Sequence, residues 1–385
     1  MSERPVIEFI DLKAQRQHIG KAMDEAILKV VHDGNYILGE QVQQFEAGLA
    51  AFCGAKHAIG VANGTDALIL VLEALGIGPG DAVICPSFTF AATAEVVAWM
   101  GATPVFAEID EATYNIDPKS LGATLETAKQ HKLNPRALIS VDLFGQACDY
   151  EPIEAFCKQN GLVLISDSAQ GYGARYKGRV AGAIGDFATT SFFPAKPLGC
   201  YGDGGAILTD SDEHAALLMS LRFHGKGSYK YDNVRVGVNS RLDTIQAAVL
   251  IEKLKIYAEE IEKRQVVAAR YTAALKDVVV TPHVMADCVS TWAQYTIRVD
   301  ADRRDAFQAA LKAKGVPTTV YYPKPLHQQT AYKHYPVAGN GLPISERVAQ
   351  EVVALPMHPY LDESTQDYII AQVLEALAAP AAAVA

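Results

Sequence analysis

The sequence of 385 residues predicts an α/β fold, with a large domain built on a mostly parallel sheet flanked by helices and a smaller C-terminal α+β domain. Two observations predict this fold. From about residue 40 to 210, short apolar runs alternate with helical patterns, as in parallel βαβ units. After residue 210 the pattern changes to one long helical stretch, roughly 242–277, which contains no glycine or proline. We therefore expect an N-terminal arm over 1–35, a large domain over 36–260 and a small domain over 261–385.

The individual elements follow from local patterns. Residues 40–54 have the amphipathic spacing of a helix ended by glycine. Short apolar runs predict strands, and the amphipathic segments between them predict helices. The predicted strands of the large domain begin at 58 and cover 81–87, 104–110, 137–145 and 162–170, with helices over 89–101 and 152–161. In the small domain we predict a strand over 292–300, a helix over 306–316 and a strand over 318–326.

Composition excludes several classes of function. The chain has 44 acidic and 34 basic residues and a net charge of −10, so no general basic surface for nucleic acid is expected. No run approaches 18 apolar residues and the N-terminus lacks a signal-peptide pattern, so no membrane partner is expected. The six cysteines lack paired or metal-type spacing, which predicts reduced core thiols in a cytoplasmic protein: Cys53, Cys85, Cys148, Cys157, Cys200 and Cys288.

One lysine has an unusual setting, in TSFFPAKPLGCYGDGG at 190–205. Pro194 and Pro197 exclude a helix interior or a central strand on either side of Lys196. The glycines that follow permit turns closed to other residues. The segment therefore predicts a rigid loop that presents one amine, although an ordinary surface lysine fits the local pattern equally well.

A second motif is the polar turn in ANGTDALIL, where Asn63, Gly64, Thr65 and Asp66 open a predicted helix. Free N–H groups and the helix dipole make such a turn suitable for a phosphate. Simple capping of the helix is the alternative explanation.

Further polar and aromatic residues follow predicted strands. Asp167 ends the strand in LVLISDSAQ, and a carboxylate there is costly to bury unless it is paired. Gln170 stands three residues on, and Ser191 could add a hydroxyl to a phosphate site. Phe88 and Phe90 could supply a flat face over a planar ring, or could be ordinary core aromatics.

Together these residues match pyridoxal 5′-phosphate. Its aldehyde needs a lysine, its ring nitrogen a carboxylate, its phosphate a helix N-terminus and its ring an apolar wall. Competing motifs are weaker, because GIGPGD at 76–81 follows a helix and contains proline. The sequence contains neither an H-E-x-x-H motif nor a G-x-S-x-G motif, and we interpret none of the ten histidines as a metal ligand.

Five motifs resemble, in order and spacing, the DegT-type sugar-nucleotide aminotransferases, which are fold-type-I pyridoxal-phosphate enzymes. They are NGTDAL, PSFTFAATAE, SDSAQGYGARYKGR, SFFPAKPLGCYGDGGA and GVNSRLDTIQAA. The resemblance implies that Lys196 forms the internal aldimine and later acts as a general base, and that Asp167 pairs with the ring nitrogen. It also implies that Gln170 approaches the ring hydroxyl, that Phe90 stacks on the ring, and that the phosphate is held by Gly64, Thr65, Asp66 and Ser191.

The same resemblance implies a homodimer with shared active sites. Asn239 resembles the family residue that reaches the phosphate of the neighbouring subunit, and Arg241 resembles its companion near the substrate.

The substrate implied by the resemblance is a keto-sugar nucleotide, with L-glutamate as amino donor. EFIDLKAQ, GNYILGEQV, RVGVNSRLDT and LPMHPYLD are most similar to the subgroup that acts at C3 of UDP-2-acetamido-2-deoxy-3-oxo-D-glucuronate, for bacterial surface polysaccharides. An acidic sugar needs local cations, and the candidates are Arg241, Lys324 and His327. Tyr321, a further candidate contact, stands where that subgroup tends to have histidine.

Other functions stay open. A dTDP-3-oxo-6-deoxyhexose is the second substrate class and a 4-oxo sugar the third. A sugar dehydratase of this family has histidine in place of the lysine, so Lys196 argues against it. A non-catalytic regulator that binds the cofactor or a nucleotide sugar is the remaining alternative.

Overall fold

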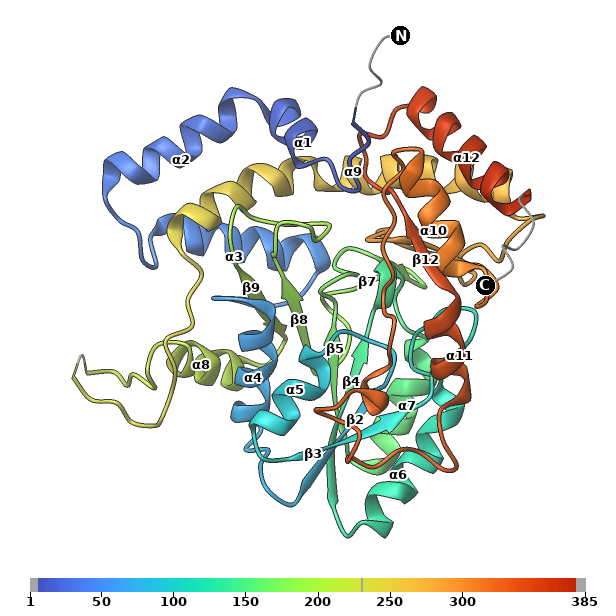
Figure 1. Cartoon of the computed structure of the whole chain (residues 1–385). Helices are drawn as coiled ribbons and strands as arrows, with labels where there is room; N and C mark the ends of the chain where they lie inside the picture. Colours follow the sequence, from blue (N-terminus) through green and yellow to red (C-terminus); the bar gives the residue numbers. More distant parts are fainter. Residues whose placement is uncertain (1–5, 230, 379–385) are drawn as a thin grey trace.

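The described part of the chain, residues 6–229 and 231–378 of a computed structural model, is built around a seven-stranded sheet (Figure 1). Its strands lie in the order β1-β9-β8-β5-β4-β2-β3. Neighbours from β8 to β3 pair in parallel, whereas β9 runs antiparallel to both β1 and β8. The predicted mostly parallel sheet is thus confirmed. The strands are β1 (His57–Val61), β2 (Asp81–Pro86), β3 (Thr103–Ala107), β4 (Asn134–Val141), β5 (Val163–Asp167), β8 (Phe187–Ser191) and β9 (Gly205–Thr209).

Helices cover both faces of this sheet because successive strand residues point to opposite sides. In β2, Val83 and Cys85 pack into the core on one face, and Ile84 packs into the core on the other. Helices α4, α5 and α8 belong to the first face, and α3, α6 and α7 to the second. These helices are α3 (Glu40–Cys53), α4 (Gly64–Ala74), α5 (Ala92–Trp99), α6 (Leu121–Gln130), α7 (Tyr150–Asn160) and α8 (Asp212–Leu221).

The long helix predicted over roughly 242–277 is confirmed as α9 (Thr244–Leu275). It packs against α2 (Lys21–Asp33) and α3 and also against the C-terminal helix α12 (Glu363–Ala378). A shorter helix, α1 (Leu12–Ile19), precedes α2. The predicted domain boundary between 260 and 261 falls inside α9, and the division into domains stays a prediction.

The C-terminal part pairs two antiparallel strands and surrounds them with helices. The strands are β11 (Tyr295–Arg298) and β12 (Val352–Leu355), and the helices beside α12 are α10 (Arg304–Ala313) and α11 (Pro343–Glu351). A small separate sheet joins β10 (Cys288–Val289), β6 (Arg175–Tyr176) and β7 (Arg179–Val180). Three short 3₁₀ turns cover Pro118–Ser120, Leu143–Gly145 and Leu326–Gln328.

One strand prediction is wrong. Within residues 318–326, Thr319 makes an isolated bridge to Ala354, and the chain then continues as a loop. The loop contains Pro323 and Pro325, which lack the N–H that a strand pairing requires.

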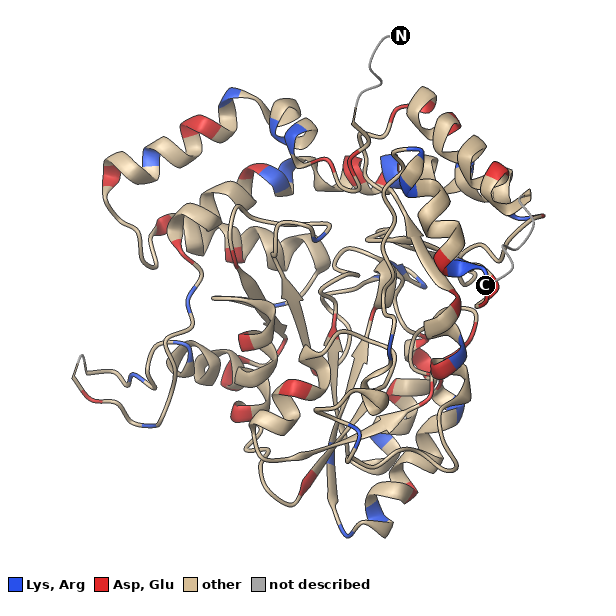
Figure 2. Ribbon diagram, in the orientation of Figure 1, with Lys and Arg blue, Asp and Glu red and all other residues tan. Residues whose placement is uncertain are grey.

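Charged residues of both signs are interspersed along the outer helices, whereas the central strands are largely uncharged (Figure 2). All six cysteines are free, and five of them are buried, as predicted for core positions. Within residues 6–229 and 231–378, no helix combines the length and hydrophobicity needed to cross a membrane.

Candidate active site

The predicted site residues gather at one edge of the sheet. Strands β1, β2, β4, β5 and β8 all point the same way, so the loops that follow them leave from the same side. In open α/β sheets this carboxyl edge forms the ligand crevice. Here it receives the predicted polar turn after β1, the two phenylalanines after β2, Asp167 and Gln170 from β5, and Ser191 and Lys196 from β8.

Asp167 and Lys196 act on each other electrostatically at this edge. Asp167 is the last residue of β5, and its Oδ1 accepts the N–H of Ala169 at 3.0 Å. Burial raises the pKa of Asp167, and the charge of Lys196 counteracts this rise. Burial lowers the pKa of Lys196, and the charge of Asp167 counteracts this fall. The site therefore holds a carboxylate that requires a cation and an amine that loses its proton more readily than an exposed lysine.

The start of α4 lies directly against the end of β8. Asn63 caps this helix, with its Oδ1 accepting the N–H of Asp66 at 2.8 Å. A Cβ at Gly64 would come within 2.7 Å of the Cβ of Ser191, so only glycine allows this approach. Because the first N–H groups of a helix lack partners within it, the turn and Ser191 form a candidate cradle for an anion.

Gln170 connects the sheet edge to a distant loop. Its Oε1 accepts the N–H of Phe144 at 2.7 Å, and its Nε2 donates to the Oη of Tyr322 at 3.2 Å. The ring of Tyr322 lies 6.3 Å from that of Phe90, between centroids. Phe90 is 55% exposed and Phe88 only 1%, so Phe90 is the one available to a ligand and Phe88 belongs to the core.

Asn239 and Arg241 flank a residue that is anchored close to the cradle. Between them, Ser240 is buried, and its Oγ accepts the N–H of Ala62 at 3.1 Å. Asn239 is exposed, and the guanidinium of Arg241 lies 5.0 Å from the centre of the Phe223 ring. Their action across a dimer interface stays a prediction.

The remaining candidate residues lie in the loop after Thr319. Tyr321 is partly buried, and its ring centroid lies 6.4 Å from that of Phe9, whereas Lys324 is exposed. Both ring nitrogens of His327 have partners within the protein, at Ser87 and Glu346. The substrate roles of Tyr321, Lys324 and His327 stay predictions.

Three functional candidates were absent from the prediction. Tyr322 follows the predicted site residue Tyr321, and nothing in the sequence shows which of these two tyrosines contacts Gln170. Arg264 and His358 line a pocket together with Lys196. Burial lowers the pKa of His358 to about 4, so this histidine is neutral at neutral pH. The only available signal for it was the histidine in LPMHPYLD.

Comparisons with known proteins show what this chain is similar to in sequence and in fold. The sequence profile of the DegT/DnrJ/EryC1/StrS aminotransferase family matches residues 17–374. The UDP-2-acetamido-2-deoxy-3-oxo-D-glucuronate aminotransferase of Pseudomonas aeruginosa is 48% identical over 367 residues, which cover 95% of this chain and 99% of the relative. A pleiotropic regulatory protein of Geobacillus stearothermophilus is 43% identical over 373 residues, covering 96% and 98%. The crystal structure of a DegT DnrJ EryC1 StrS aminotransferase from Brucella abortus has a TM-score of 0.95 and 52% identity, covering 97% of this chain and all of that one.

Proposed function

The chain belongs to the DegT/DnrJ/EryC1/StrS aminotransferase family, and on this premise we propose that it uses pyridoxal 5′-phosphate to transfer an amino group from L-glutamate to a keto-sugar nucleotide. The observation that carries the proposal is that the buried Asp167 and the half-buried Lys196 leave from the same edge at which α4 begins. This combination suits a ligand that has an aldehyde, a basic ring nitrogen and a phosphate.

The residues present fit this cofactor. Pyridoxal phosphate supplies an aldehyde that bonds an amine and a ring that accepts the electron pair of the adjacent carbon. Asp167 would hold a protonated ring nitrogen, because a buried carboxylate needs a positive partner. The cradle formed by Gly64, Thr65, Asp66 and Ser191 would hold the phosphate, and Phe90 is available for the ring.

Lys196 has two tasks in this proposal. Its amine would bond the aldehyde, which requires the unprotonated form that burial favours. Once released, its Nζ would accept a proton from the α-carbon of the donor and return it during the second half of the reaction. The prolines on either side keep the loop in place while the side chain moves.

The substrate that we propose is UDP-2-acetamido-2-deoxy-3-oxo-D-glucuronate, aminated at C3 for bacterial surface polysaccharides. The relative from Pseudomonas aeruginosa, named for this substrate, supports the choice. A sugar carboxylate would require a cation, and Arg241 and Lys324 are the candidates. We also propose a cytoplasmic location, in keeping with six unpaired cysteines.

We further propose a homodimer in which Asn239 and Arg241 complete the neighbouring site. Residues 231–238, just before Asn239, expose large apolar side chains. Val236 is 84% exposed and Tyr231 is 77% exposed. It extends from the body of the molecule beyond α8 (Figure 1). Such a surface is typical of a protein–protein contact.

The test is a panel of keto-sugar nucleotides incubated with holoenzyme and L-glutamate and analysed by mass spectrometry. We expect the mass of UDP-2-acetamido-2-deoxy-3-oxo-D-glucuronate to change to that of its 3-amino product. Preferred amination of a dTDP-3-oxo-6-deoxyhexose or of a 4-oxo sugar would overturn the proposed substrate and keep the reaction. Binding without turnover of any sugar would favour a regulator, a possibility raised by the name of the Geobacillus stearothermophilus relative.

A further inference from the structure

His327 is joined to two parts of the chain that lie far from it in sequence. Its Nδ1 lies 2.7 Å from the Oγ of Ser87, the residue that follows β2, and its Nε2 lies 3.0 Å from Oε1 of Glu346 in α11. Ser87 is fully buried and also accepts two backbone N–H groups, from Leu326 at its carbonyl oxygen and from His327 at its Oγ. Four hydrogen bonds therefore hold this part of the loop.

The Glu346 carboxylate accepts, so the Nε2–H of His327 donates to it. The Ser87 Oγ accepts the backbone N–H of His327. In the neutral ring the Ser87 hydroxyl donates to Nδ1, and in the protonated ring Nδ1–H donates to the same oxygen. Every polar atom of the His327 ring is thus satisfied within the protein, and neither nitrogen is left for a substrate.

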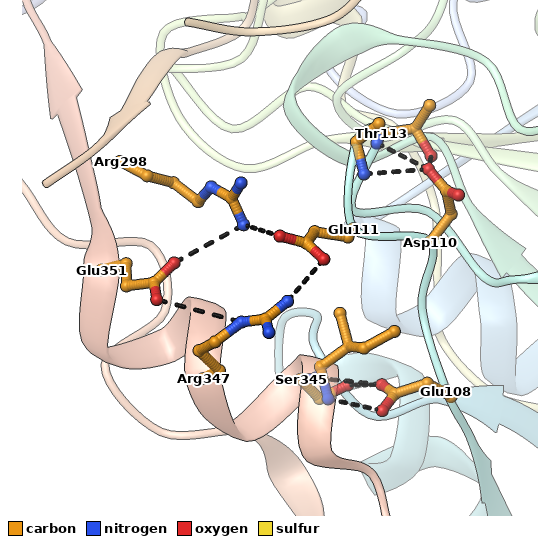
Figure 3. A network of polar contacts seen from close by, with 10 residues as sticks. Glu108, Asp110, Glu111, Thr113, Arg298, Ser345, Arg347 and Glu351 are labelled. Atoms are coloured by element: carbon orange, nitrogen blue, oxygen red, sulfur yellow. Dashed lines mark hydrogen bonds and ion pairs between the residues drawn. The ribbon is translucent and has the colours of Figure 1, made fainter. Parts of the chain in front are cut away.

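Helix α11 is itself held by polar contacts at its start and further along its length (Figure 3). Glu108, directly after β3, accepts the N–H of Ile344 at 2.8 Å and both the N–H and the Oγ–H of Ser345, at 3.0 and 2.6 Å. Further along the helix, Arg347 forms an ion pair with Glu111. Oε2 of Glu351 lies 3.5 Å from Nη1 of Arg298. Glu346 therefore projects from a helix whose position is already determined.

The loop held in this way is the one that carries the candidate substrate contacts. Tyr322 joins it to Gln170 at the site edge, and His327 joins it to α11 and β2. Lys324 lies between these two attachments, and Tyr321 directly precedes the first. We propose that His327 is a positioning residue, which Ser87 and Glu346 orient so that residues 321–327 are held in place to receive the sugar nucleotide.

This proposal rests on the proposed function for its substrate, and it makes a specific kinetic prediction. Glu346→Ala should raise the KM for the sugar nucleotide about tenfold, with kcat and the KM for L-glutamate within about twofold of the wild type. Glu346→Gln, which keeps an acceptor oxygen, should restore most of the affinity. Gln350→Ala, an exposed change one turn further along α11, is the matched control and should change nothing.

A double-mutant cycle tests whether Glu346 acts through His327. The variant His327→Ala/Glu346→Ala should be no worse than His327→Ala alone. Additive losses would overturn the proposal, as would an unchanged KM in Glu346→Ala.

Hydrogen exchange of the holoenzyme gives a measurement that needs no turnover. Glu346→Ala should speed exchange of the amides of residues 321–328 about fivefold or more, with the thermal midpoint nearly unchanged. Unchanged exchange would refute the positioning role even if no keto-sugar were aminated. Wild-type inactivity together with faster exchange in the variant would refute the proposed function and leave the positioning role standing.

Discussion

Asp167 and Lys196 each shift the pKa of the other against the effect of burial, although they leave from the ends of two different strands. Each is costly to bury alone, and each reduces that cost for the other. At Lys196 the charge that opposes the effect of burial is Asp167, at the edge of the sheet, whereas at Lys253 in α9 it is Glu260 of the same helix.

Borohydride reduction of the holoenzyme should attach the cofactor to Lys196 and remove the yellow colour of the protein. Lys253 is the internal control, because it is buried and because burial lowers its pKa as well, to about 8. It lies in α9 and makes a cation–π contact with Tyr201 at 4.6 Å. Peptide mapping that found label on Lys253, or no label, would contradict the proposed role of Lys196.

Asp167→Asn should keep the fold and lose most turnover, because a neutral amide cannot hold a ring nitrogen protonated. We expect a loss of roughly 3–5 kcal/mol in transition-state stabilisation, about a hundred- to several-thousand-fold in rate. Since burial raises the pKa of Asp167, the apoprotein should not be destabilised by the change. Asp203→Asn, an exposed change in the loop after Lys196, serves as the control and should keep its activity. Near-normal activity of Asp167→Asn would exclude Asp167 from the cofactor site.

Gly64→Ala should weaken binding of pyridoxal phosphate by about tenfold or more. The added Cβ would come within 2.7 Å of the Cβ of Ser191, so the start of α4 must move away from the end of β8. Fluorescence titration of the apoprotein with the cofactor gives the dissociation constant. Gly122→Ala, where a Cβ meets nothing within 4 Å, should leave the affinity as it is. Equal affinities for the two variants would argue against the phosphate cradle.

Mixing two inactive variants tests the shared site. In a heterodimer of Lys196→Ala and Arg241→Ala, one site carries both lesions and the other carries neither, provided that Arg241 acts across the interface. With random exchange about half of the dimers are mixed, so about a quarter of the wild-type activity should return. A mixture that stays inactive after mass spectrometry has confirmed exchange would mean that Arg241 serves its own subunit.

The free energy of unfolding should decrease as the pH falls below 6.5, and His358 should cause part of this decrease. Burial lowers its pKa to about 4, so the unfolded chain binds the proton first as pH falls. The stability contributed by the neutral ring is therefore complete above pH 6.5 and is lost as pH falls from 6.5 towards 4. At pH 5 the loss amounts to about 2 kcal/mol. Urea unfolding of wild type and His358→Gln at pH 7 and pH 5 should show a smaller pH effect in the variant, and equal pH effects would contradict this role.

Local patterns were sufficient to predict strands β1 to β5 of the central sheet and the long helix, and to single out the candidate site residues. Asp167 at a strand end, the turn after Val61 and the proline-flanked Lys196 are each defined by a few neighbouring residues. Side-chain alternation and the special backbone of glycine and proline act over that same short range. Each motif alone left its ligand open, and the combination of motifs then indicated pyridoxal phosphate. The family resemblance added the roles of the individual residues and the class of substrate.

Packing alone decided the contacts between distant segments. Gln170 meets Tyr322 across 152 residues of sequence, and Ser87 meets His327 across 240, so no local pattern could show either pair. No local pattern could show the close approach of Gly64 to Ser191 either, or the burial of Phe88 beside an exposed Phe90. The sequence by itself thus determined which residues stand at the ends of strands. The tertiary structure decided which of them face one another, because a side-chain contact depends on how whole helices and strands pack.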